Sequence, residues 1–210
     1  MKNNRVIIQN GRVVDPANNL DGICDILVEE GKISRIAQNI KADDVRAIDA
    51  TEKIVMPGIV DMHVHLREPG REDKETVTSG TKAGLKGGVT TMLAMPNTEP
   101  AMDCPENIAL LKNIIKKSAH SQVLIAGTIT QGRLGKDLVD IAELKKTGVV
   151  AISDDGASVD SEALILRALK EASEAKLLVI AHCEDKAVSL NGVVNLVIVS
   201  TRLGLRGSPK

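Results

Sequence analysis

The sequence predicts an α/β fold: an incomplete (β/α)8 barrel of the TIM type with about five strands, preceded by a small N-terminal β layer. Apolar segments of strand length recur about every 30 residues after residue 57, and helical patterns lie between them. Polar residues gather where those segments end, as they do at the mouth of a barrel. Neither GxGxxG nor GxxxxGK[ST] follows an early strand, which disfavours a doubly wound nucleotide-binding sheet.

Composition excludes several classes of protein. The formal net charge of the 210 residues is −1, which gives no long-range attraction to nucleic acid or to an anionic membrane. The chain has no Phe, Tyr or Trp, so it cannot bind single-stranded nucleic acid by aromatic stacking. No apolar run reaches the roughly 18 residues of a membrane span. Three widely spaced cysteines and the lack of a signal peptide lead us to expect a cytoplasmic protein.

Residues 1–55 are expected to form a small β-sandwich-like layer of antiparallel strands. Segment 5–15 contains the pair Asn10-Gly11, which predicts a tight hairpin. Segment 23–38 repeats this pattern with Glu30-Gly31 at its turn. Two short strands are expected to follow, before residue 58.

Residues 56–210 are expected to form the partial barrel. Helical patterns cover 105–117, with Pro105 in the first turn, and 161–176, with Ser161 as N-cap. A closed barrel needs eight strand–helix units and about 250 residues. We therefore expect the sequence to be the N-terminal portion of a longer protein. The five strand candidates begin at Ile59, Val89, Val123, Val149 and Leu177.

Histidines and a carboxylate at the strand ends predict a metal site. His63 and His65 share a face, because successive side chains of a strand alternate. Asp155 follows the fourth strand and His182 follows the fifth, so a barrel would bring both to the same mouth. Imidazole and carboxylate are ligands for zinc and related metals. Two simpler explanations stay open: a lone histidine is often a hydrogen-bonded core residue, and the Asp-Asp-Gly run at 154–156 can be a turn.

Two further polar residues suggest an anionic substrate. Arg67 lies two residues beyond His65, and arginine binds carboxylates through two parallel hydrogen bonds. Asn97 ends the second strand and can both donate and accept, which suits a substrate with amide groups. The alternative for Arg67 is a loop salt bridge with Glu68 or Glu72.

At these residues the sequence resembles the dihydroorotases of the long bacterial type, in the amidohydrolase superfamily. The resemblance covers essentially the whole chain and rests on PGIVDMHVHLREPG, KGGVTTMLAMPNTEP, SDDG, AHCED and STRLGLRG. Hydantoinases and allantoinases share the HxH pair but less of the surrounding REPG and PNT context. The resemblance implies a metal-dependent cyclic amidohydrolase that interconverts N-carbamoyl-L-aspartate and L-dihydroorotate in pyrimidine (UMP) biosynthesis.

The resemblance also implies roles for individual residues. Arg67 and Asn97 would bind the substrate carboxylate. Asp155 would take the place of the carboxylated lysine that bridges two metals in many relatives. The family's proton-transfer aspartate would lie beyond Lys210, so no catalytic residue is assigned and the chain is expected to be a truncated, inactive fragment. The ligands of one or two Zn²⁺ ions would be His63, His65, Asp155 and His182.

Two other functions compete with this one. A hydantoinase- or allantoinase-like enzyme is disfavoured by Arg67 and Asn97, because hydantoinases bind rings with little anionic character. A non-catalytic partner of aspartate transcarbamoylase is disfavoured because all four metal-ligand candidates are kept. The expected partners are the small-molecule substrate, with aspartate transcarbamoylase or a second copy of the chain as further options, and neither nucleic acid nor membrane.

Overall fold

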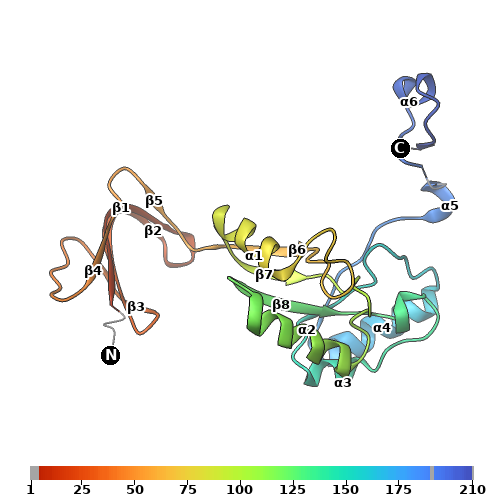
Figure 1. Cartoon of the computed structure of the whole chain (residues 1–210), viewed down its shortest axis with the longest axis horizontal. Helices are drawn as coiled ribbons and strands as arrows, with labels where there is room; N and C mark the ends of the chain where they lie inside the picture. The colour runs from red at the N-terminus through yellow and green to blue at the C-terminus, as the bar shows by residue number, and fades with distance from the viewer. Residues whose placement is uncertain (1–4, 190–191, 210) are drawn as a thin grey trace. The chain divides into compact units, whose positions relative to one another are not determined.

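The computed structural model describes residues 5–189 and 192–209 (Figure 1). Contacts divide the chain into two compact units, one up to Gly58 and one from Ile59 onward. Among the described residues, no helix is long and apolar enough to cross a lipid bilayer.

The first unit is a mixed five-stranded sheet. Its strand order is β3-β2-β1-β4, and β5 also pairs with β1. Strands β1, β2 and β3 are antiparallel neighbours, but β4 and β5 run parallel to β1. The expectation of an entirely antiparallel layer is therefore wrong for β4 and β5. The elements are β1 (Val6–Asp15), η1 (Pro16–Asn18), β2 (Leu20–Glu29), β3 (Lys32–Ala37), β4 (Arg46–Asp49) and β5 (Ile54–Val55).

The Asn10-Gly11 pair forms a bulge within β1, and the predicted hairpin there is wrong. Asn10 has a φ of +63°, and the register against β2 shifts between Ile8 and Gly11. The N–H of Asn10 donates to Asp25 Oδ1 at 2.9 Å, so the displaced backbone group is paired by a side chain of β2. A Cβ on Gly11 would lie 2.6 Å from Val55, which explains the glycine. Strand β1 therefore continues through the pair without reversing.

The chain reverses at two other places. The short helix η1 and Asn19, with a φ of +52°, lead β1 into β2. Glu30 and Gly31, with φ values of +51° and +75°, join β2 to β3. Glu29 pairs directly with Lys32 across this turn, so the hairpin predicted at Glu30-Gly31 is confirmed.

The second unit contains a fully parallel five-stranded sheet that curls into half of a barrel (Figure 1). The strand order β10-β9-β8-β7-β6 follows the sequence without a crossover. Each strand begins within two residues of its predicted start, so the predicted parallel strands are confirmed. The strands are β6 (Ile59–Val64), β7 (Val89–Ala94), β8 (Gln122–Gly127), β9 (Ala151–Ile152) and β10 (Leu178–Val179).

Helices connect successive strands of this sheet. The predicted helices at 105–117 and 161–176 are α2 and α4, and Ser161 Oγ accepts the N–H of Leu164 at 3.3 Å as the expected N-cap. Five short elements are also found among the described residues of this unit: η2 (Gln131–Arg133), α5 (Lys186–Ser189), α6 (Ile198–Arg202) and the paired strands β11 (Val194–Asn195) and β12 (Gly207–Ser208). The longer helices are α1 (Val77–Lys86), α2 (Pro105–Ser118), α3 (Ile141–Lys146) and α4 (Glu162–Glu174).

The two faces of the parallel sheet pack differently. Ala94, Ile125 and Ile152 belong to a core that also contains side chains from α1, α2, α3 and α4. Their neighbours Leu93 and Ala126 belong to a separate, smaller cluster. Because adjacent residues of a strand point to opposite faces, the helices cover one face and the smaller cluster lies on the other.

We expect Gly70→Ala to destabilise the second unit by about 2–4 kcal/mol, through backbone strain and overpacking together. Gly70 has a φ of +105°, and a Cβ there would lie 2.3 Å from the main-chain oxygen of Glu99. Gly87→Ala is the matched control, because its φ is negative and the nearest atom would be 3.4 Å away. Urea denaturation of both variants gives the comparison, and equal midpoints would contradict the close packing at Gly70.

Candidate metal centre

The paired histidines lie on the sheet face that the helices do not cover. Val64 packs against the helix-side core. His63 and His65 flank Val64 in sequence, so alternation directs both imidazoles to the opposite face. Met95 and Ile180 belong to the smaller cluster on that face. Asn97 and His182 each follow one of these residues by two positions.

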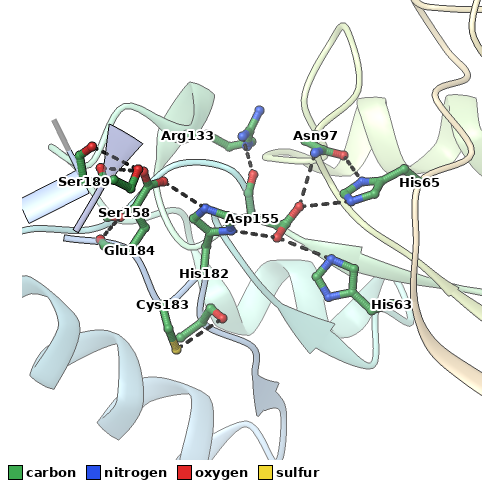
Figure 2. Close-up of polar contacts among 12 residues, drawn as sticks. His63, His65, Asn97, Arg133, Asp155, Ser158, His182, Cys183, Glu184 and Ser189 are labelled. Carbon is green, nitrogen blue, oxygen red and sulfur yellow. Dashed lines mark hydrogen bonds and ion pairs between the residues drawn. The ribbon is translucent and has the colours of Figure 1, made fainter. Parts of the chain in front are cut away.

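The Asp155 carboxylate lies between three imidazoles (Figure 2). Its Oδ1 is 3.3 Å from His63 Nε2 and 3.5 Å from His182 Nδ1. Its Oδ2 is 3.4 Å from His65 Nε2. The side chain of Asp155 is 7% exposed, whereas those of His63 and His182 are 43% and 38% exposed. The carboxylate is therefore enclosed by rings that solvent can still reach.

Three of these residues form a compact donor group. One ligand atom each from His63, His65 and Asp155 lie within 4.8 Å of one another, the one such group found among the described residues. His182 lies outside this group and approaches Asp155 from the other side (Figure 2). A carboxylate with imidazole nitrogens on both sides can bind a single metal ion or bridge two ions.

Neighbouring residues determine which nitrogen of two rings carries hydrogen. Asn97 Oδ1 lies 2.9 Å from His65 Nδ1, so Nδ1–H is the donor and Nε2 keeps its lone pair. Glu184 Oε2 lies 3.1 Å from His182 Nε2, which leaves the lone pair of Nδ1 facing Asp155. This assignment follows from the hydrogen-bond partners of each neutral ring. In both rings the nitrogen that faces Asp155 therefore carries no hydrogen, and its lone pair can bind a metal ion.

The distances around Asp155 fit a shared cation. A direct charge-assisted N–H···O bond measures about 2.7–2.9 Å, which is shorter than the 3.3–3.5 Å found here. Two donors bound to one tetrahedral Zn²⁺ at about 2.0–2.1 Å lie about 3.4 Å apart. Nitrogen and oxygen lone pairs repel one another unless a cation lies between them. The residues therefore fit a divalent ion that takes imidazole and carboxylate ligands.

The adjacent Asp154 has a structural role. Its Oδ1 accepts the N–H groups of Ile129 and Thr130 at 2.8 and 3.1 Å, and its Oδ2 accepts the Thr130 hydroxyl. Asp154 is buried and ties the loop after β9 to the loop after β8. Both of its oxygens are used in these contacts, and Asp155 is the aspartate that reaches the imidazoles.

The side chain of Arg67 has no hydrogen-bond or ion-pair partner among the residues that the structure describes. Glu68 Oε2 instead accepts the Val77 N–H at the start of α1, at 2.7 Å. Glu72 Oε1 accepts the Gly70 N–H at 2.8 Å. The salt-bridge explanation for Arg67 therefore does not hold in the described chain, and its guanidinium is available to an anionic ligand.

Asn97 links two of the ligand candidates. Besides its contact with His65, its Nδ2 donates to Asp155 Oδ2 at 3.3 Å. The amide therefore joins His65 to Asp155 directly, a role that its position at the strand end did not reveal. Its second N–H is left for another acceptor.

Arg133 and Glu184 contact the site and were not predicted. The guanidinium of Arg133 donates to the main-chain oxygen of Asp155, and its Nε is buried without a partner among the described residues. No motif marks Arg133, which ends the short helix η2 after β8. Glu184 had a signal that could have been used, because it is a carboxylate two residues after a candidate histidine ligand.

A cavity of about 660 Å³ lies beside His182, between the loop after β9 and the segment after β10. Its lining includes Asp160, Glu184 and Asp185. Carboxylates repel an anionic substrate. An anionic substrate would therefore bind more favourably beside the guanidinium of Arg67 and the amide of Asn97 than in this cavity.

Cys104 is one of three free cysteines among the described residues. Burial raises the pKa of the Cys104 thiol, which lies at the N-cap of α2. A raised pKa keeps the thiol protonated at neutral pH, and only the thiolate is a good nucleophile. His120 follows α2 and is exposed.

The parallel half-barrel with an HxH pair, an aspartate and a histidine at its strand ends defines an amidohydrolase-type protein. A family model described as dihydro-orotase-like matches residues 52–210. The chain belongs to the dihydro-orotase-like family.

Individual relatives agree with this assignment. The dihydroorotase of Elusimicrobium minutum (strain Pei191) is 49% identical over 202 residues, covering 96% of this chain and 47% of that protein. The dihydroorotase of Thermoanaerobacter sp. (strain X514) is 45% identical over 206 residues, covering 98% and 48%. The chain thus spans about half the length of the curated relatives it matches.

A solved structure shares the fold. The L-hydantoinase (dihydropyrimidinase) from Arthrobacter aurescens superposes with a TM-score of 0.74 at 24% identity, covering 88% of this chain and 42% of that chain. At this identity the likeness concerns the fold alone.

The adjacent aspartates give a matched pair of variants. We expect Asp155→Ala to lower Zn²⁺ content with little change in the stability of the metal-free chain, because its carboxylate makes no short hydrogen bond. We expect Asp154→Ala to lower the free energy of unfolding by about 2–6 kcal/mol, since two buried N–H groups lose their acceptor at about 1–3 kcal/mol each. Urea denaturation with chelator present and metal analysis after dialysis separate the two effects. Equal loss of stability in both variants would refute this division of roles.

Proposed function

We propose that the chain carries the metal-binding half of a dihydroorotase, which interconverts L-dihydroorotate and N-carbamoyl-L-aspartate. The observation that carries this proposal is the Asp155 carboxylate with imidazole nitrogens at 3.3, 3.4 and 3.5 Å, in a chain of the dihydro-orotase-like family. The 49% identity to a protein named dihydroorotase supports the substrate. A cytoplasmic location follows from this role in pyrimidine synthesis.

The proposed ligands are His63, His65, Asp155 and His182, and the proposed metal is zinc. A bound Zn²⁺ lowers the pKa of water to about 7 and polarises a carbonyl group, which is the chemistry that opening a cyclic amide requires. Asp155 has donors on both sides, which supports a bridging role if two ions bind. Asn97 and Glu184 hold the rings of His65 and His182 in the tautomers that binding needs.

We propose that Arg67 and Asn97 bind the substrate carboxylate. Arg67 has no competing carboxylate partner among the described residues, and guanidinium pairs with carboxylate through two parallel hydrogen bonds. Asn97 keeps one N–H for the same group. Together they would orient the ring so that its scissile amide faces the metal group.

The proposed enzyme also defines the organisation of the chain. Residues 56–210 would supply five of the eight units of a TIM-type barrel, and residues 1–55 would supply part of a separate β layer. The division of contacts after Gly58 supports this assignment. A small-molecule substrate is the proposed partner. Retention of all four ligand candidates argues against a purely non-catalytic partner of aspartate transcarbamoylase, and no observation favours a homodimer.

An activity test can use a close relative. We expect the 210-residue chain alone to show no ring opening of L-dihydroorotate, because no proton-transfer residue is assigned in it. Fused to the C-terminal half of the Elusimicrobium minutum dihydroorotase, it should hydrolyse L-dihydroorotate in a metal-dependent way. The same fusion carrying His63→Ala and His65→Ala should be inactive. A folded, zinc-loaded fusion that hydrolyses hydantoin but not L-dihydroorotate would favour the hydantoinase alternative instead.

The substrate contact can be tested in that fusion. We expect Arg67→Lys to raise the KM for L-dihydroorotate about tenfold or more, since lysine offers a point charge without the bidentate geometry. Zinc content should stay at the level of the parent fusion. Arg71→Lys is the matched control, because Arg71 pairs with exposed Asp73 at 3.1 Å. An unchanged KM in Arg67→Lys would remove this residue from the substrate site.

A further inference from the structure

We propose that Glu184 is a positioning residue for His182, which it holds so that Nδ1 points toward the cation beside Asp155. The inference rests on the proposed metal centre and goes beyond it, because Glu184 is not itself a ligand. Glu184 Oε2 lies 3.1 Å from His182 Nε2, and His182 Nδ1 lies 3.5 Å from Asp155 Oδ1 (Figure 2). One imidazole therefore joins two carboxylates, one on each ring nitrogen.

Three further contacts with described residues hold Glu184. Its Oε1 accepts from Ser189 Oγ at 2.7 Å, which leaves Oε2 for the imidazole. Its main-chain N–H donates to the carbonyl oxygen of His182 at 2.9 Å. Its main-chain oxygen accepts from Ser158 Oγ at 2.6 Å. Ser158, in the loop after β9, thus holds the main chain of Glu184, and Ser189, at the end of α5, holds its carboxylate beside the ring of His182.

His182 needs such an anchor more than the other two histidines do. His63 lies within β6 and His65 directly follows it, so the strand directs both side chains. His182 instead follows the two-residue strand β10 by three positions, in a segment without regular structure. His182 also faces Asp155 through Nδ1, whereas the other two rings face it through Nε2. A ring rotated about its Cβ–Cγ bond would present a carbon to the cation.

The carboxylate also acts on the strength of the ligand. A metal-binding imidazole that donates its second N–H to a carboxylate is a stronger base at the nitrogen that binds the metal. His65 receives the corresponding contact from the neutral amide of Asn97. The ring of His65 therefore bonds to a neutral amide, whereas the ring of His182 bonds to a negatively charged carboxylate.

The cavity beside His182 offers a matched control. Asp160 lines the same cavity but has no contact with His182. Asp160→Asn therefore removes the same charge from the same cavity without removing the support of the ring. Glu184→Gln keeps an oxygen that can accept the Nε2–H, and Glu184→Ala removes it.

The test is the affinity of the 210-residue chain for Zn²⁺, measured against a competing chromophoric chelator. We expect Glu184→Ala to weaken binding about 10–100-fold, the usual effect of removing an outer partner of a histidine ligand. Glu184→Gln should fall between Glu184→Ala and the wild type, because it keeps the acceptor and loses the charge, and Asp160→Asn should match the wild type. In a His182→Ala background, Glu184→Ala should cause no further loss, because its effect passes through that ring. Circular dichroism of each metal-free variant checks that it is folded.

The outcomes test the metal centre and the positioning role of Glu184 separately. If the wild type binds Zn²⁺ and Glu184→Ala binds equally well, Glu184 does not position His182 and the metal centre stands. If Asp160→Asn loses as much affinity as Glu184→Ala, the charge of the cavity is the cause and the inference is refuted. If Glu184→Ala still weakens Zn²⁺ binding by the same factor in the His182→Ala background, local folding is the cause and the inference is refuted. A folded wild-type chain that binds no Zn²⁺ refutes the metal centre and this inference together.

Discussion

The site depends on one buried carboxylate that three imidazoles approach from separate strands. The oxygens of Asp155 face nitrogens of His63, His65 and His182 at distances too long for good hydrogen bonds and suited to a shared cation. This arrangement requires the carboxyl ends of β6, β9 and β10 to lie at one edge of a single sheet. The parallel order of the strands meets that requirement, and the helices on the other face hold the strands in register.

Around this carboxylate, each supporting residue performs a separate task. Asn97 and Glu184 fix the tautomers of two rings, and Arg133 binds the main chain of Asp155. Asp154 binds the neighbouring loop through both of its oxygens. The two consecutive aspartates thus face in opposite directions, as adjacent residues after a strand do. Asp154 ties two loops together, and Asp155 faces the three imidazoles.

The elements that local patterns specify could be predicted, and those that distant partners specify could not. The five parallel strands were visible as apolar runs of strand length, and α2 and α4 carried recognisable first turns at Pro105 and Ser161. The pairing of His63 with His65 followed from alternation alone. Asn10-Gly11 could not be placed, because a hairpin and a bulge both need positive φ. Asp25, fifteen residues further along the chain, decides for the bulge by accepting the N–H of Asn10. The contact of Arg133 with Asp155 likewise exists only once β8 and β9 are paired.

Except for His63 and His65, the ligand candidates of this site lie far from one another in the sequence. A disordered chain would have to close long loops to gather them, at a cost in entropy that a single ion does not easily offset. Metal would therefore bind the folded state almost exclusively, and its binding free energy would add to the stability of that state. Under the proposed function, metal supply in the cell would then shift the balance between folded and unfolded chain, as well as the occupancy of the site.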